Sequence, residues 1–199
     1  MSTTTDVTEL ETPERHPIHL VVTDDLQRSR LTVFFRLLLA IPLFIWLAVW
    51  GIAVVFVAIV GWVAALVLGR LPDGLHSFLA AYDRFQTHVN AYFFIAANPY
   101  PSFTGAPGYP LDVDIAPPAP QSRLTILVRL ILAIPAFIVL YVLQLVGQVV
   151  GILAWFYALF TGSMNPGMRD LLAYWLRYQA QTYGYALLLT GRYPSFSDD

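Results

Sequence analysis

Two arginines, Arg84 and Arg177, lie near the middle of two segments whose polar and apolar residues alternate with a helical period. A guanidinium group carries five N–H donors in a planar fork that fits phosphate or carboxylate oxygens. These arginines are therefore candidates for binding a phosphate headgroup or another anion. Asp83 and Asp170 are near in sequence, so the alternative is a structural arginine that pairs inside the protein or snorkels to the interface.

A second pair of arginines, Arg36 and Arg129, stands alone in long apolar runs. Residues 31–68 and 124–160 contain no other charged side chain. A charge within a membrane-depth helix faces a partner or reaches to the interface. We expect the guanidinium groups of Arg30 and Arg36 to snorkel to lipid headgroups, and Arg36 and Arg129 are candidates for lipid or ligand binding.

The second apolar run also contains two glutamines one helical turn apart, Gln144 and Gln148. An amide within a bilayer is costly unless it is hydrogen-bonded, so the pair either lines a pore or ligand pocket or joins neighbouring helices. Gly147 and Gly151 fit the small-xxx-small pattern, which lets helices approach closely. We expect these two glycines to mediate helix packing.

Motifs that would indicate catalysis or a cofactor are lacking. The chain contains no cysteine, no glycine-rich phosphate loop, no nucleophile elbow and no zincin motif. The four histidines lack metal-ligand spacing, and His16 and His19 are expected on opposite faces of a strand. The net charge of -2 gives no basic field for nucleic acid. The sequence predicts a non-enzymatic protein with no catalytic residues, metal site, cofactor or nucleic-acid partner.

Composition indicates a membrane protein. Hydrophobic residues make up 57% of the 199 residues and charged residues only 12%, against about a quarter charged in an average soluble domain. Both long apolar runs exceed the ~18 residues that mark a candidate span. We therefore expect an all-α, multi-pass integral membrane protein whose partners are the lipid bilayer and, as an open possibility, a membrane protein or a second copy.

The chain is a tandem repeat with a shift of 93 residues (129 − 36) and no gap. The shift aligns charged and proline positions as well as apolar ones, including Ser29-Arg30-Leu31-Thr32 with Ser122-Arg123-Leu124-Thr125 and Tyr100-Pro101-Ser102-Phe103 with Tyr193-Pro194-Ser195-Phe196. A shared apolar bias would not align such positions, so duplication is indicated. We predict a disordered tail at 1–15, a first membrane repeat at 16–106 and a second at 107–199.

Each repeat is expected to contain a short strand, a long apolar helix and an amphipathic helix. Residues 111–115 alternate apolar and acidic side chains, which is typical of a strand, and residues 16–22 are their equivalent. Pro42 and Pro135 predict a kink or break in each long run, giving an interfacial helix over 29–41 followed by a span over 43–68. The alternative is a two-crossing hairpin turning near Gly51 and Gln144. Residues 75–97 and 168–190 form the amphipathic helices.

Orientation follows from the number of crossings. An even number in each repeat would make the two repeats parallel and place most arginines on one side of the membrane. The positive-inside tendency would then put both termini in the cytoplasm.

Several motifs resemble a known family. Ala40-Ile41-Pro42 follows an arginine-bearing apolar helix, Phe160-Thr161-Gly162 forms a loop, and Leu189-Thr190-Gly191-Arg192-Tyr193-Pro194-Ser195-Phe196 closes the second repeat. Together they resemble the bacterial membrane domain of unknown function family 4389, in two tandem copies. The resemblance implies a multi-spanning protein of the bacterial inner membrane and carries no catalytic residue with it.

Two functions fit these features. The first is a non-enzymatic membrane subunit that binds a partner or lipid, indicated by packing motifs and interfacial aromatic residues. The alternative is a small transporter or channel-like module, indicated by the repeats and their polar helix faces.

Overall fold

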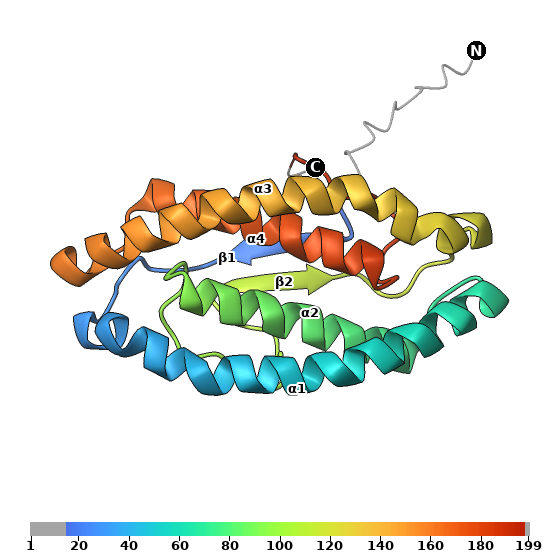
Figure 1. Ribbon diagram of the computed structural model, residues 1–199, viewed down its shortest axis with the longest axis horizontal. Helices are drawn as coiled ribbons and strands as arrows, with labels where there is room; N and C mark the ends of the chain where they lie inside the picture. Colours follow the sequence, from blue (N-terminus) through green and yellow to red (C-terminus); the bar gives the residue numbers. More distant parts are fainter. Residues whose placement is uncertain (1–14, 198–199) are drawn as a thin grey trace, which may run out of the picture.

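The computed structural model describes residues 15–197. Their order is β1 (Ile18–Val22), α1 (Arg30–Leu68), α2 (Asp73–Phe93), β2 (Leu111–Ile115), α3 (Arg123–Thr161) and α4 (Pro166–Ala186), as Figure 1 shows. The fold is mostly helical, with a two-stranded sheet and two tandem units of strand, long helix and shorter helix. Of the predicted N-terminal tail, all but Arg15 lies outside the described residues.

The long helices α1 and α3 are continuous over 39 residues each. Pro42 and Pro135 lie on their exposed sides, where one missing N–H donor can be accommodated by curvature. Both helices bow outward around the shorter pair (Figure 1). The predicted division at the prolines, and the alternative hairpin near Gly51 and Gln144, are therefore wrong.

The ends of the long helices follow local sequence. Each begins after a serine with extended backbone, Ser29 or Ser122, and each ends at a glycine in the left-handed region. Gly69 and Gly162 have φ of 74° and 75°, and their N–H groups donate to Ala65 and Ala158. This is the usual way in which a glycine closes a helix.

The two repeats run in opposite directions. The N–H of Arg28, before α1, donates to the carbonyl of Gly162 after α3 (3.0 Å), and the N–H of Gln121, before α3, donates to Gly69 after α1 (2.7 Å). The start of each long helix thus lies beside the end of the other. The predicted parallel arrangement, with most arginines at one end, is wrong.

The sheet explains this inversion. β1 and β2 are equivalent strands of the two repeats and pair antiparallel, with Leu20 opposite Val113. These two residues are themselves repeat equivalents (113 − 20 = 93). A pseudo-twofold axis therefore passes through this residue pair and relates the helices that follow β1 to the helices that follow β2.

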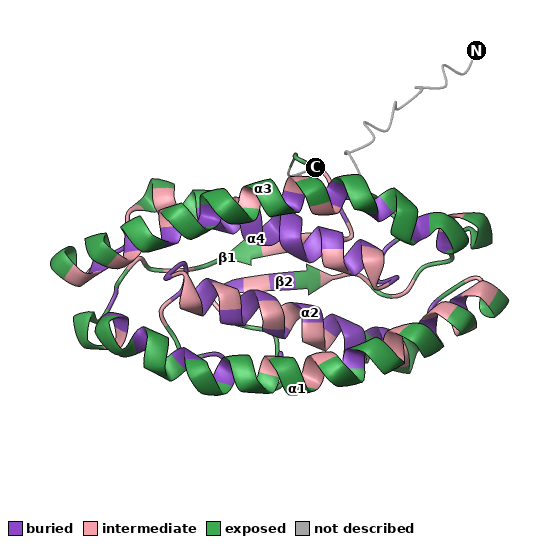
Figure 2. Ribbon diagram, viewed as in Figure 1, coloured by how far each residue is buried: buried purple, intermediate pink, exposed green. Residues whose placement is uncertain are grey.

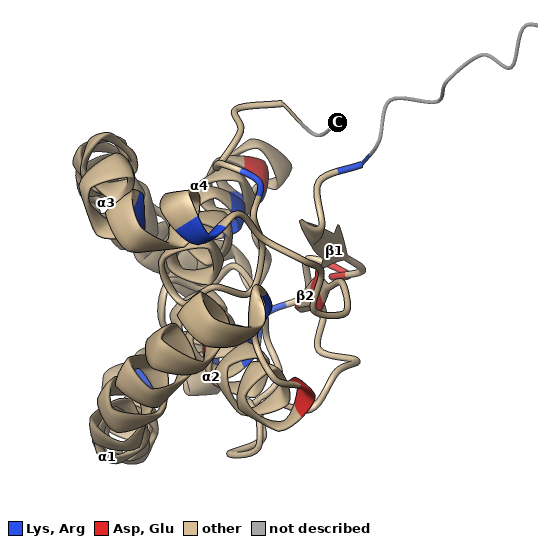
Figure 3. Ribbon diagram, turned by 90° about the vertical axis from the view of Figure 1, so that its right-hand side faces the viewer, with Lys and Arg blue, Asp and Glu red and all other residues tan. Residues whose placement is uncertain are grey.

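The elements form three layers. Seen end-on, α1 and α3 form one face, α2 and α4 the middle, and the sheet the opposite face (Figure 3). The strands are exchanged between repeats: β1 packs on α4, and β2 packs chiefly on α2. Each strand predicted to open a repeat therefore packs against the amphipathic helix of the other repeat.

The buried core lies around α2 and α4, while α1 and α3 expose apolar side chains along their length (Figure 2). Both long helices are apolar and long enough to cross a membrane. Within the protein, only 11% of the most apolar window of α1 and 28% of that of α3 is buried, whereas the core helix of a soluble protein is mostly buried.

Candidate anion-binding site beside the sheet

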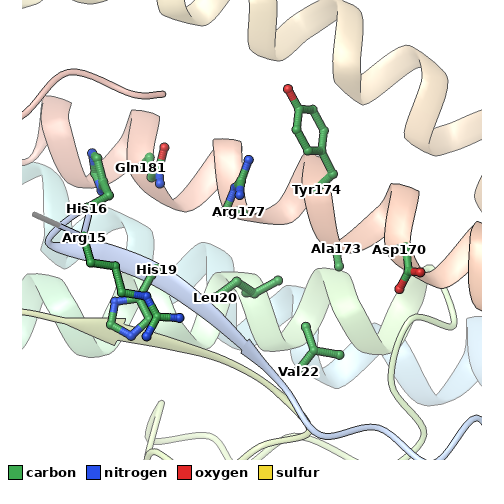
Figure 4. A pocket seen from close by; sticks show the side chains of 10 residues that line it. All are labelled: Arg15, His16, His19, Leu20, Val22, Asp170, Ala173, Tyr174, Arg177 and Gln181. Atoms are coloured by element: carbon green, nitrogen blue, oxygen red, sulfur yellow. The ribbon is translucent and has the colours of Figure 1, made fainter. Parts of the chain in front are cut away.

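Arg177 lies on the side of α4 that faces β1, beside a cavity of about 490 Å³. The cavity walls come from the segment before β1, from β1 itself and from α4 (Figure 4). The lining residues are Arg15, His16, His19, Leu20, Val22, Asp170, Ala173, Tyr174, Arg177 and Gln181. Two arginines and two histidines therefore border one hollow on the sheet side of the molecule.

Arg177 and Gln181, one helical turn apart, join α4 to the chain segments on either side of it. Nη2 of Arg177 donates to the carbonyl of Phe196 (2.9 Å), and its guanidinium lies 5.1 Å from the ring centre of Tyr174. The Gln181 amide donates to the carbonyl of Ile18 and accepts from the N–H of Ser195, both at 3.0 Å. The two side chains are thereby held in place, with Arg177 only 6% exposed.

The two histidines of the cavity are each held through a ring nitrogen. Nδ1 of His16 lies 3.0 Å from the N–H of Ile18, and Nε2 of His19 lies 3.4 Å from the carboxylate of Asp114. The other nitrogen of His19, Nδ1, is buried and has no hydrogen-bond partner among the described residues. The backbone of Tyr193 also interacts with the His16 ring and acts to raise its pKa. Burial lowers the pKa of His16. The strand begins only at Ile18, so both histidines border the same cavity instead of lying on opposite strand faces.

Arg84 is the repeat equivalent of Arg177 (177 − 84 = 93), and its surroundings are different. Its Nε donates to the carbonyl of Val113 (3.0 Å) and lies 3.5 Å from the carboxylate of Asp112. The same carboxylate is 2.9 Å from Nε2 of His88 and accepts from the N–H of Gly108 (2.6 Å). Arg84 therefore has an internal counterion, and the cavity there is smaller, about 280 Å³.

Asp112 is held as an anion. Burial acts to raise its pKa, but the hydrogen bonds from His88 and the Gly108 N–H outweigh burial, so the pKa of Asp112 is lowered. The cavity beside Arg84 thus already holds a carboxylate of the protein itself, the side chain of Asp112.

Arg36 and Arg129 close the C-terminal ends of the shorter helices. Nη1 of Arg129 donates to the carbonyls of Tyr185 (3.1 Å) and Thr190 (2.8 Å), and Arg36 donates likewise to Tyr92 (2.8 Å) and to the residue equivalent to Thr190. The guanidinium groups are at most 1% exposed. The expected snorkelling of Arg36 to headgroups is wrong, because the unpaired carbonyls at a helix end attract a cation.

The glutamines and glycines of α3 lie on different sides of that helix. Gln144 and Gln148 are exposed, line none of the cavities described here and form no hydrogen bond within residues 15–197. Gly147 and Gly151 are buried, and a Cβ atom there would come within 2.6 Å of Trp175 and within 2.4 Å of Phe94. The glycines thus make room for aromatic side chains of neighbouring segments.

Two further polar groups, Arg28 and Gln121, were not singled out from the sequence. Arg28 donates to the carbonyl of Ile95 (3.0 Å), and its equivalent Gln121 donates to that of Leu188 (2.9 Å), so both stabilise a residue with positive φ. The repeat alignment pairs Arg28 with Gln121 and could have indicated a shared role. Asp83 is 1% exposed, and neither carboxylate oxygen has a partner among the described residues.

Fold and site together define the class: a duplicated helical protein with one long apolar face, an opposite polar face and a basic cavity beside a small sheet. Residues 30–105 and 123–198 each match the model of the domain of unknown function DUF4389. The chain therefore belongs to this family, with two tandem copies. No curated protein and no solved structure matches the chain.

Proposed function

We propose that this protein is a non-enzymatic membrane protein that lies in the plane of one leaflet. In this arrangement α1 and α3 are immersed in hydrocarbon, and the sheet faces water. The molecule then acts as an anchored platform that presents its polar face to a ligand or partner. This arrangement replaces the multi-pass topology expected from the lengths of the apolar runs.

The position of the sheet is the observation that carries the proposal. β1 and β2 lie alongside the middle of the long helices, on the opposite face (Figures 1 and 3). With the long helices perpendicular to the membrane, the open strand edges and Asp114 would sit at mid-bilayer depth. Unpaired backbone groups each cost several kcal/mol in lipid, and open sheet edges are not found there.

The length of the helices supports the same arrangement. At 1.5 Å per residue, each 39-residue helix is ~58 Å long, while the hydrocarbon core is ~30 Å thick. A transmembrane orientation would require a tilt of about 60°, beyond the usual range of about 0–40°. Helices that lie in the membrane plane have no such mismatch.

The distribution of charge supports it as well. The exposed surface of α1 is formed by large apolar side chains such as Leu38, Ile52 and Phe56, and that of α3 by side chains such as Ile131. Arg36 and Arg129, the charged residues inside these helices, point away from that surface and are buried. Burying such an apolar face contributes about 25 cal/mol per Å², so the face favours hydrocarbon over water.

Single-cysteine labelling in a chain without native cysteine tests the proposal. Ser29 and Ser163 lie at one end of the long helices, and Ser77 and Ser122 at the other. An impermeant maleimide should label all four single-cysteine variants from the same side of the membrane. Labelling of the two ends from opposite sides would refute the in-plane arrangement. Ile52→Cys, on the exposed apolar face, is the control and should stay unlabelled until detergent is added.

A second candidate function, a small transporter, is favoured by the inverted relation of the repeats. Inverted repeats are common in secondary transporters, where they create alternating access across the membrane. This function requires that both long helices cross the bilayer. The labelling experiment therefore separates the two candidates before any flux is measured.

A further inference from the structure

Four aromatic side chains line a hollow between α1, α2 and the loop that follows α2. They are Trp46 and Trp50 of α1, Phe78 of α2 and Phe103 of the loop, and the hollow has a volume of about 450 Å³. No charged side chain of residues 15–197 lines it. The hollow is therefore walled chiefly by aromatic rings and contains no ion of the protein itself.

The rings stand at steep angles to one another and do not stack. The ring centres of Trp46 and Phe103 are 6.4 Å apart at an angle of 86°, and those of Trp50 and Phe78 are 6.0 Å apart at 68°. The two indoles are 6.4 Å apart at 53°. The indole N–H of Trp46 donates to the carbonyl of Phe103 (2.8 Å), which fixes this ring against the loop. A small group seated among these rings can therefore touch more than one of them.

The second repeat has aliphatic side chains at the same place. At the shift of 93 (139 − 46), the residues that match Trp46, Trp50 and Phe78 are Val139, Leu143 and Leu171. Val139 and Leu143 are partly buried and pack against the apolar core. Helix packing at this place therefore does not require aromatic rings. An acyl chain would not require them either, because aliphatic walls bury apolar area just as well.

We propose that this hollow binds the trimethylammonium headgroup of a lipid such as phosphatidylcholine. The face of an aromatic ring carries partial negative charge, and it attracts a cation that lies within about 6 Å of the ring centre. A quaternary ammonium group has no N–H donor, so it needs no acceptor from the walls, and its methyl groups contact the rings directly. Aromatic rings that surround such a group are its usual recognition site in proteins.

The hollow also lies at a boundary between apolar and polar surface, where a headgroup is expected. Its α1 wall includes Val49, which belongs to the exposed apolar surface of that helix, whereas its loop side includes the exposed Thr104. α1 is in the layer farthest from the sheet and α2 is in the middle layer (Figure 3). The assignment to a lipid rests on the in-plane arrangement proposed above, in which this boundary lies between hydrocarbon and water.

Calorimetric titration of the detergent-purified protein with two short-chain lipids tests the proposal. Dihexanoylphosphatidylcholine and dihexanoylphosphatidylethanolamine share their chains and phosphate and differ only in the methyl groups on nitrogen. Phosphatidylcholine should bind about tenfold more tightly, because a desolvated cation–π contact is of this size. Trp46→Val and Phe78→Leu, which copy the second repeat, should remove most of this preference.

The control is Phe56→Leu, which removes an aromatic ring from the exposed surface of α1 outside the hollow and should keep the tenfold preference. Melting temperatures show whether each variant is folded. Should Trp46→Val not keep the fold, Trp46→Leu combined with Trp50→Phe takes its place and should likewise weaken the preference.

Three results would overturn the proposal. Equal affinity for the two lipids would show a site for acyl chains only, and an unchanged preference in both Trp46→Val and Phe78→Leu would place the headgroup elsewhere. Choline that binds as tightly as phosphatidylcholine would assign a soluble ligand and refute the lipid source. The titration is made in detergent, so its outcome is independent of the cysteine labelling that decides the in-plane arrangement.

Discussion

Replacement of Arg129 by methionine should destabilise the second repeat by removing the cation that closes α4. Arg129 is fully buried, and its Nη1 donates to the carbonyls of Tyr185 and Thr190 at 3.1 and 2.8 Å. Its guanidinium also lies 4.5 Å from the ring centre of Tyr185. Methionine retains much of the apolar stem but supplies no donor to these carbonyls.

The magnitude follows from the contacts that are lost. Hydrogen bonds from a charged donor contribute about 1.5–3 kcal/mol each, so two such bonds amount to roughly 3–6 kcal/mol. Removing the buried charge returns part of this, because its desolvation penalty disappears as well. We expect a net loss of about 2–4 kcal/mol, which for a chain of this size lowers the melting temperature by roughly 5–15 °C.

Thermal unfolding in detergent measures the loss, and hydrogen exchange localises it. Amides of residues 187–191 should exchange faster in Arg129→Met than in the wild type. Arg30→Met, at an exposed position on α1, is the control and should change the melting temperature little. Equal melting temperatures for Arg129→Met and Arg30→Met would refute the idea that the buried arginine closes the helix.

Three further changes test other parts of the fold. Burial raises the pKa of Asp83 well above its usual range, so the folded protein is most stable below pH ~4, where Asp83 is neutral in both states, and it loses stability as the pH rises. Asp83→Asn should therefore raise the melting temperature by an amount that is absent near pH 3 and grows toward pH 8. A gain that does not depend on pH would contradict this. Gly147→Ala should lower the free energy of unfolding by about 1–3 kcal/mol, because its Cβ would come within 2.6 Å of the Trp175 ring. Gly74→Ala is the control: its Cβ would have nothing within 4 Å, so it should not destabilise the protein when the two variants are compared by thermal unfolding. Joint replacement of Gln144 and Gln148 by leucine should leave the monomer's melting temperature within about 2 °C of wild type, because these exposed amides form no hydrogen bond within residues 15–197. A larger drop would reveal a structural role for them.

Much of the fold could be predicted because the repeat and the hydrophobic period are local properties of the chain. The gap-free shift of 93 residues (129 − 36) indicated two copies of one unit, and the alternation in residues 111–115 indicated a strand. The predicted break at Pro42 failed because proline removes one donor, and an exposed position on a long helix can absorb that loss by bending.

The candidate site could be predicted only in part. Arg177 stood out because it repeats Arg84 at the middle of an amphipathic helix. Its neighbours His16 and His19 did not, since they come from the segment that opens the other repeat, more than 150 residues away (177 − 19 = 158). Only the exchange of strands between repeats brings these residues to one cavity.

The sequence by itself determined that the chain is duplicated, that two of its helices are long and apolar, and which arginines recur in both copies. The tertiary structure decided how the copies are related and what each arginine does. The antiparallel pairing of β1 with β2 inverts the second repeat, and this places Arg36 and Arg129 at opposite ends, each against a helix terminus. Strand pairing joins distant segments through backbone hydrogen bonds, and every residue except proline can donate one. Side-chain patterns along the chain therefore do not show whether two strands pair parallel or antiparallel.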